Sequence, residues 1–135
     1  MTQRLNATFR ITGWDDQPYD EIEHGPKLTR TKVTKVFEGD VEGESSLEYL
    51  MVQQPDGSAA FVGVERVVGQ LGGRSGSFVL QHTGTFADGV ARDSYEVVSG
   101  SGTGDLRGLR GLRGGGSFEV AHADRHPFVL DYDFE

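Results

Sequence analysis

The stretch Gly69–Phe86, which reads GQLGGRSGSFVLQHTGTF, decides the fold. It begins with a glycine pair at 72 and 73, and glycine accepts the positive φ angles of a tight turn. From about Arg74 to Gly84 the side chains then alternate in character, as they do along a strand with one buried face. One face carries Phe78, Leu80 and His82, and the other carries Ser77, Val79, Gln81 and Thr83. The stretch therefore predicts a turn followed by a half-buried strand.

The same period of two recurs along the rest of the chain, whereas no helical period of convincing length does. It is clearest at the end of the sequence, where Phe128, Leu130, Tyr132 and Phe134 alternate with smaller or acidic residues. Turn signals such as Pro55-Asp56-Gly57 separate the strands. We expect strands at Leu5–Trp14, Lys27–Glu38, Val41–Gln53, Ala59–Val68, Arg74–Gly84, Val90–Val98, Ser117–Val120 and Phe128–Phe134.

These eight strands, joined by hairpin-length links, predict one all-β domain that spans residues 1–135. Eight antiparallel strands can close into a small barrel, whose interior is filled by side chains or holds one small ligand. Two segments fall outside the strands. The acidic segment Asp15–Pro26 is expected to be a solvated loop, and the repeat LRGLRGLRG at 106–114 is expected to be a short strand or turn lengthened by duplication.

Composition limits the possible partners. The net charge of -8 argues against nucleic acid and against an anionic membrane surface, both of which need clustered Lys and Arg. There is no cysteine, no apolar span and no secretory signal, so we expect a cytoplasmic soluble protein. His122 and His126 are four residues apart, but Pro127 follows directly and no helix is expected to pair them. We therefore expect no metal and no cofactor.

Three blocks carry a resemblance to a known family: EYLM at 48–51, FVGVERVVGQLGGRSGSFVLQHTGTF at 61–86 and SGTGDLRGLRG at 101–111. They resemble a family of small bacterial proteins of unknown function that is assigned the allene oxide cyclase-like barrel, a fold shared with plant dirigent proteins. The third block is similar to the GGTG-x-F-x-x-A-R-G segment of dirigent proteins. The resemblance implies an eight-stranded antiparallel barrel with a central cavity and a homo-oligomeric assembly. It implies no reaction.

His82 is the first candidate for a functional residue, because it shares a face with Phe78 and Leu80. If that face is internal, His82 is either a cavity histidine that titrates near neutral pH or a core histidine held by one hydrogen bond. Glu65 and Arg66 are neighbours in a strand, so one of them faces the interior and needs a partner or a ligand there.

Aromatic residues complete the expected pocket. Tyr49 shares a face with Leu47 and Met51, and Tyr132 shares one with other large apolar residues, so both are expected inside. Trp14, at a strand end, is expected either to cap one mouth of the barrel or to pack at an edge. The expected ligand-binding residues are Tyr49, Glu65, Arg66, Phe78, Leu80, His82 and Tyr132.

Three functions fit these expectations. The first is a protein that binds a small apolar molecule in the barrel cavity. The second is a cyclase or isomerase that shapes a reactive intermediate there. The third is a structural or regulatory homo-oligomer with a filled core.

Overall fold

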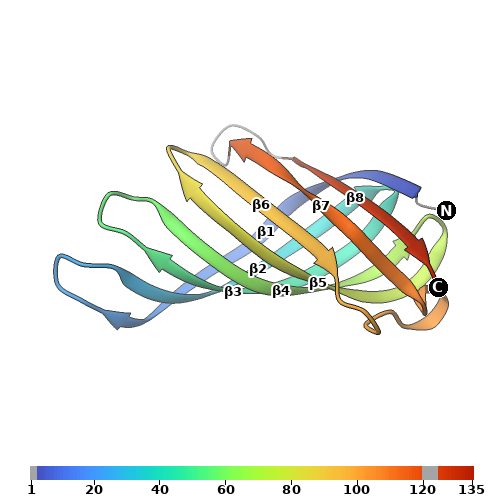
Figure 1. Ribbon diagram of the computed structural model, residues 1–135, viewed down its shortest axis with the longest axis horizontal. Helices are drawn as coiled ribbons and strands as arrows, with labels where there is room; N and C mark the ends of the chain where they lie inside the picture. Colours follow the sequence, from blue (N-terminus) through green and yellow to red (C-terminus); the bar gives the residue numbers. More distant parts are fainter. Residues whose placement is uncertain (1–2, 120–124) are drawn as a thin grey trace.

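The structure, a computed structural model, is an all-β barrel (Figure 1). It describes residues 3–119 and 125–135, with only the backbone described for 112–119. The elements in chain order are β1 (Gln3–Glu21), β2 (Lys27–Gly39), β3 (Val41–Gln53), β4 (Ala59–Leu71), β5 (Arg74–Ala87), β6 (Val90–Val97), the 3-10 turn η1 (Gly104–Leu106), β7 (Leu109–Glu119) and β8 (His126–Phe134).

Each strand pairs antiparallel with the next, and β8 pairs with β1 to close the barrel. The prediction of eight antiparallel strands is therefore confirmed. The predicted turns at Gly72-Gly73 and at Pro55-Asp56-Gly57 also form, the first joining β4 to β5 and the second joining β3 to β4. Within the described residues, no helix is long and apolar enough to cross a membrane.

The two ends of the barrel differ. Gln3 and Phe134 lie at one end, whereas the β1–β2, β3–β4 and β5–β6 hairpins project at the other (Figure 1). We call the hairpin end the mouth. β1 pairs with β8 only along Gln3–Phe9, but it pairs with β2 along Ala7–Glu21, so the β1–β2 hairpin extends beyond the closed wall.

The predicted end of the first strand at Trp14 is wrong, since β1 continues to Glu21. From Trp14 onward its residues are exposed on both faces. A strand that buries neither face does not need to alternate apolar and polar residues. The acidic segment Asp15–Pro26, which was expected to be a loop, is therefore strand as far as Glu21.

A row of three glycines crosses neighbouring strands: Gly43 of β3 pairs with Gly69 of β4, which pairs with Gly76 of β5. All three have φ angles between about +150° and +160°. A Cβ atom on any of them would collide with a backbone carbonyl of a neighbouring segment. The glycines thus let the strands approach closely and bend where the barrel curves.

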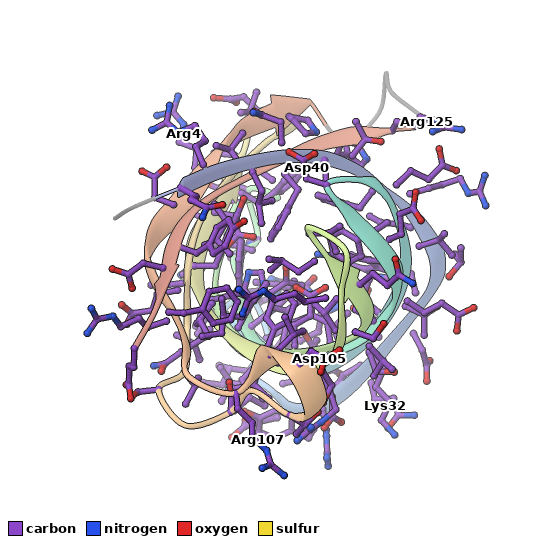
Figure 2. All side chains as sticks on the ribbon, turned by 90° about the vertical axis from the view of Figure 1, so that its right-hand side faces the viewer. Arg4, Lys32, Asp40, Asp105, Arg107 and Arg125 are labelled. Atoms are coloured by element: carbon purple, nitrogen blue, oxygen red, sulfur yellow. The ribbon has the colours of Figure 1, made fainter. Side chains whose placement is uncertain are left out.

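Inward-facing side chains fill most of the barrel (Figure 2). A larger cluster, which includes Phe37, Phe78, Leu80, Phe128 and Leu130, occupies the end near the chain termini. The smaller cluster, near the mouth, consists of Val33, Leu47, Tyr49, Met51 and Phe61.

The leucine repeat contributes to the larger cluster. Leu106, in η1, and Leu109, at the start of β7, are both buried. Arg110 points outward and pairs with Asp133 of β8. The repeat thus begins as a turn and continues as strand, so the strand expected at Ser117–Val120 begins earlier, at Leu109.

Candidate functional site

A row of ionisable side chains runs between the two clusters inside the barrel. Lys35 Nζ lies 3.4 Å from Glu65 Oε2. The other oxygen of Glu65, Oε1, lies 2.7 Å from His82 Nε2. On the far side of the ring, His82 Nδ1 lies 2.8 Å from Asp93 Oδ2. We call Lys35, Glu65, His82 and Asp93 the ion row.

Four strands supply the members of this row: β2 carries Lys35, β4 carries Glu65, β5 carries His82 and β6 carries Asp93. The intervening strand β3 supplies Ser45, whose hydroxyl donates to Glu65 Oε2 at 2.5 Å. Each residue sits at an inward position of its strand, so the pleat alone directs these polar groups into the core.

Burial of the row is nearly complete, because His82 and Glu65 are each 1% exposed and Lys35 is 5% exposed. Burying an unpaired charge costs free energy, and this cost is offset here because basic groups alternate with carboxylates along the row. The His82 ring is also packed between Tyr49 and Tyr95, with ring centroids 6.0 Å and 5.4 Å away.

The pKa values of the row favour its charged forms. Burial by itself raises the pKa of Glu65, but the charges of Lys35 and His82 and the hydrogen bonds from His82 and Ser45 outweigh it and lower that pKa to about 2. Burial lowers the pKa of His82, but its hydrogen bonds to Asp93 and Glu65, and their charges, raise it overall. His82 is therefore held between two carboxylates that favour its protonated form.

A cavity of about 270 Å³ opens at the mouth, next to the ion row. We call it the mouth cavity. Its walls are mainly apolar. Asp93 lines the cavity and also contacts His82, so its carboxylate connects the cavity to the ion row. Six more of its lining residues are Trp14, Asp16, Tyr49, Met51, Phe61 and Phe86.

The rim of this cavity has its own hydrogen bonds. Asp16 Oδ1 accepts from the Thr31 hydroxyl at 2.5 Å, and Asp16 Oδ2 accepts from Trp14 Nε1 at 3.0 Å. These bonds hold the indole of Trp14 at the mouth of the barrel. A position at the mouth is one of the two that were expected for this residue.

The structure brings together only some of the residues expected to bind a ligand. Tyr49 lines the mouth cavity, and Glu65 and His82 lie in the ion row behind it. Of the neighbours Glu65 and Arg66, the glutamate faces inward and the arginine is exposed.

The other three expected residues lie elsewhere. Phe78, Leu80 and Tyr132 belong to the larger cluster, away from the mouth cavity. The hydroxyl of Tyr132 donates to Gln3 Oε1 at 3.0 Å, close to the chain termini. Alternation placed all three on the interior face but does not reveal their height along the barrel.

Two members of the ion row, Lys35 and Asp93, were not among the expected site residues. The signal was present, since Lys35 shares a strand face with Val33 and Phe37, and Asp93 shares one with Tyr95 and Val97. A charged residue on an apolar strand face indicates a buried group that needs a partner, just as the neighbours Glu65 and Arg66 do.

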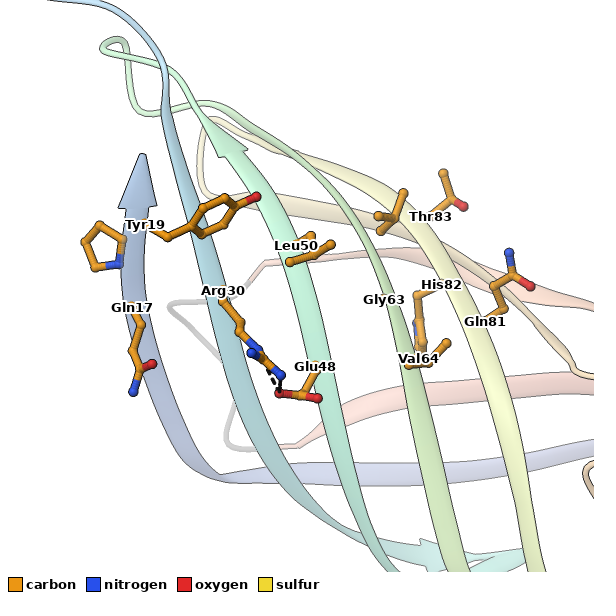
Figure 3. Close-up of a pocket in the computed structure, with 12 residues that line it drawn as sticks. Gln17, Tyr19, Arg30, Glu48, Leu50, Gly63, Val64, Gln81, His82 and Thr83 are labelled. Atoms are coloured by element: carbon orange, nitrogen blue, oxygen red, sulfur yellow. Dashed lines mark hydrogen bonds and ion pairs between the residues drawn. The ribbon is translucent and has the colours of Figure 1, made fainter. Parts of the chain in front are cut away.

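The outer wall carries a second depression, over β1–β5 (Figure 3). Arg30 and Glu48 form an exposed ion pair within it, with Arg30 Nη2 3.1 Å from Glu48 Oε1. Leu50, Val62 and Val64 are about half exposed beside that pair. We call this surface the outer groove.

Metal binding finds no support in the described residues. In 3–119 and 125–135 no group of three or more His, Asp or Glu side chains is arranged to hold an ion. The two carboxylates beside His82, those of Glu65 and Asp93, each form an ion pair with its ring. His122 lies outside the described residues.

Comparison with known proteins identifies the family. Residues 5–132 match the family model of DUF3224, described as a protein of unknown function. The chain belongs to the DUF3224 family. A solved structure of a DUF3224 protein of unknown function from Shewanella oneidensis MR-1 is similar, with a TM-score of 0.76 and 33% sequence identity over 100% of this chain and 99% of that one. No curated protein matches the sequence.

The DUF3224 assignment confirms the expected family of unknown function, and the barrel is the fold that the resemblance implied. Neither comparison names an allene oxide cyclase-like or dirigent barrel, so that label stays a prediction.

Proposed function

We propose that this DUF3224 protein binds a small, mainly apolar molecule in the mouth cavity. The observation that carries the proposal is the combination of apolar walls, including Met51, Phe61 and Phe86, with a carboxylate, Asp93, fixed by a buried histidine. Small-molecule sites usually combine an apolar lining with a few well-placed polar groups. A cavity of roughly 150 Å³ suffices for benzene, so about 270 Å³ suits a somewhat larger molecule.

Trp14 provides the test, because it is the only tryptophan and it lines the cavity. Titration with benzyl alcohol or cyclohexanone should change its fluorescence along a saturable curve. Ala59→Phe fills the cavity from its lining and should abolish that change. Ala60→Phe is the matched control, since its side chain points outward from the same strand and does not line the cavity.

Binding by neither probe, or equal binding by both variants, would reject the proposal. Folding of each variant is checked by far-UV circular dichroism, so that a loss of binding is not confused with unfolding.

A cyclase or isomerase in the same cavity is a second candidate, and two lining groups favour it. Asp93 is a carboxylate fixed by His82, and Tyr49 has a pKa raised by burial and by the charges of Asp93 and Glu65, so its phenol stays protonated. A carboxylate base near a protonated donor suits proton transfer at carbon next to a carbonyl.

The test is exchange of the α-hydrogens of cyclohexanone in D₂O, followed by proton NMR. Catalysis predicts exchange above the buffer rate that Asp93→Asn removes while cyclohexanone still binds. Binding without such exchange supports the binding function alone.

Self-association is a third candidate, favoured by the outer groove. Leu50, Val62 and Val64 present half-exposed apolar side chains on the outer face of the sheet. We expect a dimer or larger oligomer by light scattering. Val64→Lys should shift it toward the monomer, whereas Thr85→Lys, at an exposed site outside the groove, should not.

A further inference from the structure

The charged side chains that line the mouth cavity all have the same sign. They are Asp16 and Asp93, and none of the described lysines or arginines lines the cavity. Every other lining residue is apolar, aromatic, glycine or a side-chain amide, as with Gln53 and Gln54. A carboxylate in a concave, mainly apolar site exerts a stronger field than one on an open surface.

Asp16 is held in place by neutral groups. The Thr31 hydroxyl and the Trp14 indole donate to its two oxygens at 2.5 Å and 3.0 Å. Neither donor carries a charge, and no described lysine or arginine forms an ion pair with Asp16. Its orientation is fixed while its negative charge remains uncompensated.

Asp93 is only partly compensated. The imidazolium of His82 lies behind it, but the next group along the row is another carboxylate, Glu65, followed by Lys35. Three carboxylates, on Asp16, Asp93 and Glu65, thus face only one lysine and one histidine in the cavity and the row behind it. The carboxylates also lie nearest to the ligand space.

Aromatic faces complete the arrangement. Trp14, Tyr49, Phe61 and Phe86 line the same cavity, and Trp is the side chain that interacts best with a cation over its ring. The Tyr49 and Phe61 rings pack edge to face, with centroids 4.8 Å apart.

We propose that the ligand of the mouth cavity is a small organic cation, an amine or ammonium group on an apolar body. This inference rests on the proposed binding function and adds the class of ligand. The carboxylates of Asp16 and Asp93 attract the cation, the aromatic residues contact it, and the apolar walls take the hydrocarbon part.

The experiment compares three probes of similar size by ligand-observed NMR titration: benzylamine, benzyl alcohol and benzoate, which are cationic, neutral and anionic at neutral pH. We expect benzylamine to bind at least about tenfold more tightly than benzyl alcohol, and benzoate to bind most weakly. Asp16→Asn should lower the affinity for benzylamine to nearly that for benzyl alcohol.

Asp15→Asn is the matched control, because it removes the same charge from the adjacent residue, which is likewise exposed but does not line the cavity. Equal binding of benzylamine and benzyl alcohol would overturn the cation inference and leave the binding function standing. Binding of none of the three would overturn both. An equal loss in Asp15→Asn and Asp16→Asn would show a general effect of net charge and would also overturn the inference.

Discussion

His82 Nε2 lies 2.7 Å from Glu65 Oε1, and both side chains are almost completely buried. An imidazolium and a carboxylate at this distance stabilise each other strongly only while both stay charged. The stability of the barrel therefore depends on pairings inside the ion row, and on pH.

The pairing of Lys35 with Glu65 can be measured by a double-mutant cycle in urea unfolding. Glu65→Leu leaves Lys35 buried without a carboxylate and should cost about 3–5 kcal/mol. Lys35→Met combined with Glu65→Leu should cost less than the sum of the single changes, with a coupling of about 1–3 kcal/mol.

Arg30 and Glu48 form the control pair on the neighbouring strands β2 and β3, with half-exposed side chains. Their coupling should stay below about 1 kcal/mol. A coupling for Lys35 and Glu65 no larger than that would contradict the role assigned to the buried pair.

The free energy of unfolding should be greatest between about pH 4.5 and 6.5. The pKa of Glu65 is lowered from 4.5 to about 2, so its contribution is full above pH 4.5 and is lost as the pH falls toward 2. The pKa of His82 is raised from 6.5, so its contribution is full below pH 6.5 and is lost as the pH rises through the higher value of the folded state.

Urea unfolding across this pH range checks the profile. His82→Gln should lower stability and flatten the decline on the alkaline side. His24→Gln, at an exposed histidine of the β1–β2 connection, should leave the profile as it is. An unchanged alkaline limb in His82→Gln would show that His82 is not the group responsible.

Gly63→Ala should destabilise the barrel by about 1–3 kcal/mol, because the site has no room for a methyl group. The new Cβ atom would lie 2.8 Å from Tyr49 Cδ1 and 2.5 Å from the carbonyl oxygen of Glu48. Val64→Ala, at the exposed position that follows, should change stability by less than about 0.5 kcal/mol. Thermal unfolding compares the two, and equal effects would contradict the packing described.

Deleting Gly111-Leu112-Arg113 should cost little more than about 1 kcal/mol. Gly111 faces Tyr132 and Arg113 faces Asp131, so Leu112 is an extra residue in the ladder. After the deletion, Gly114 faces Tyr132 and residue 116 replaces 114 opposite Leu130, a shift of two that keeps each side chain on its face.

Deleting only Gly111-Leu112 is the contrasting change. It shifts the downstream pairing by one residue, which exchanges the inner and outer faces of β7. Urea unfolding should show a much larger loss for this shorter deletion. The opposite order of stabilities would contradict the bulge at Leu112.

The fold was predictable because alternation and turn chemistry are local. The strand from Arg74 shows its inner face in Phe78, Leu80 and His82, and the glycine pair before it needs no tertiary contact to form a turn. The extension of β1 past Trp14 was not predictable in this way, since neither of its faces is buried.

The candidate site was predictable only in part, because alternation fixes a face and not a height. Tyr49 and Tyr132 both point inward, yet they belong to different clusters. Their separation depends on strand register, which accumulates around the barrel and is set by non-local pairing. Lys35 and Asp93 were predictable without the register, because each is a charged residue that shares a strand face with large apolar residues.

The placement of Gln3 and Phe134 at the end opposite the mouth has a practical consequence for experiments (Figure 1). A tag, a fluorophore or a surface linker attached beyond either residue lies away from the β1–β2 and β3–β4 hairpins. Protein immobilised through such a linker presents the mouth cavity to solution. Attachment through either end of the chain is therefore compatible with surface-based capture of small cations from mixtures.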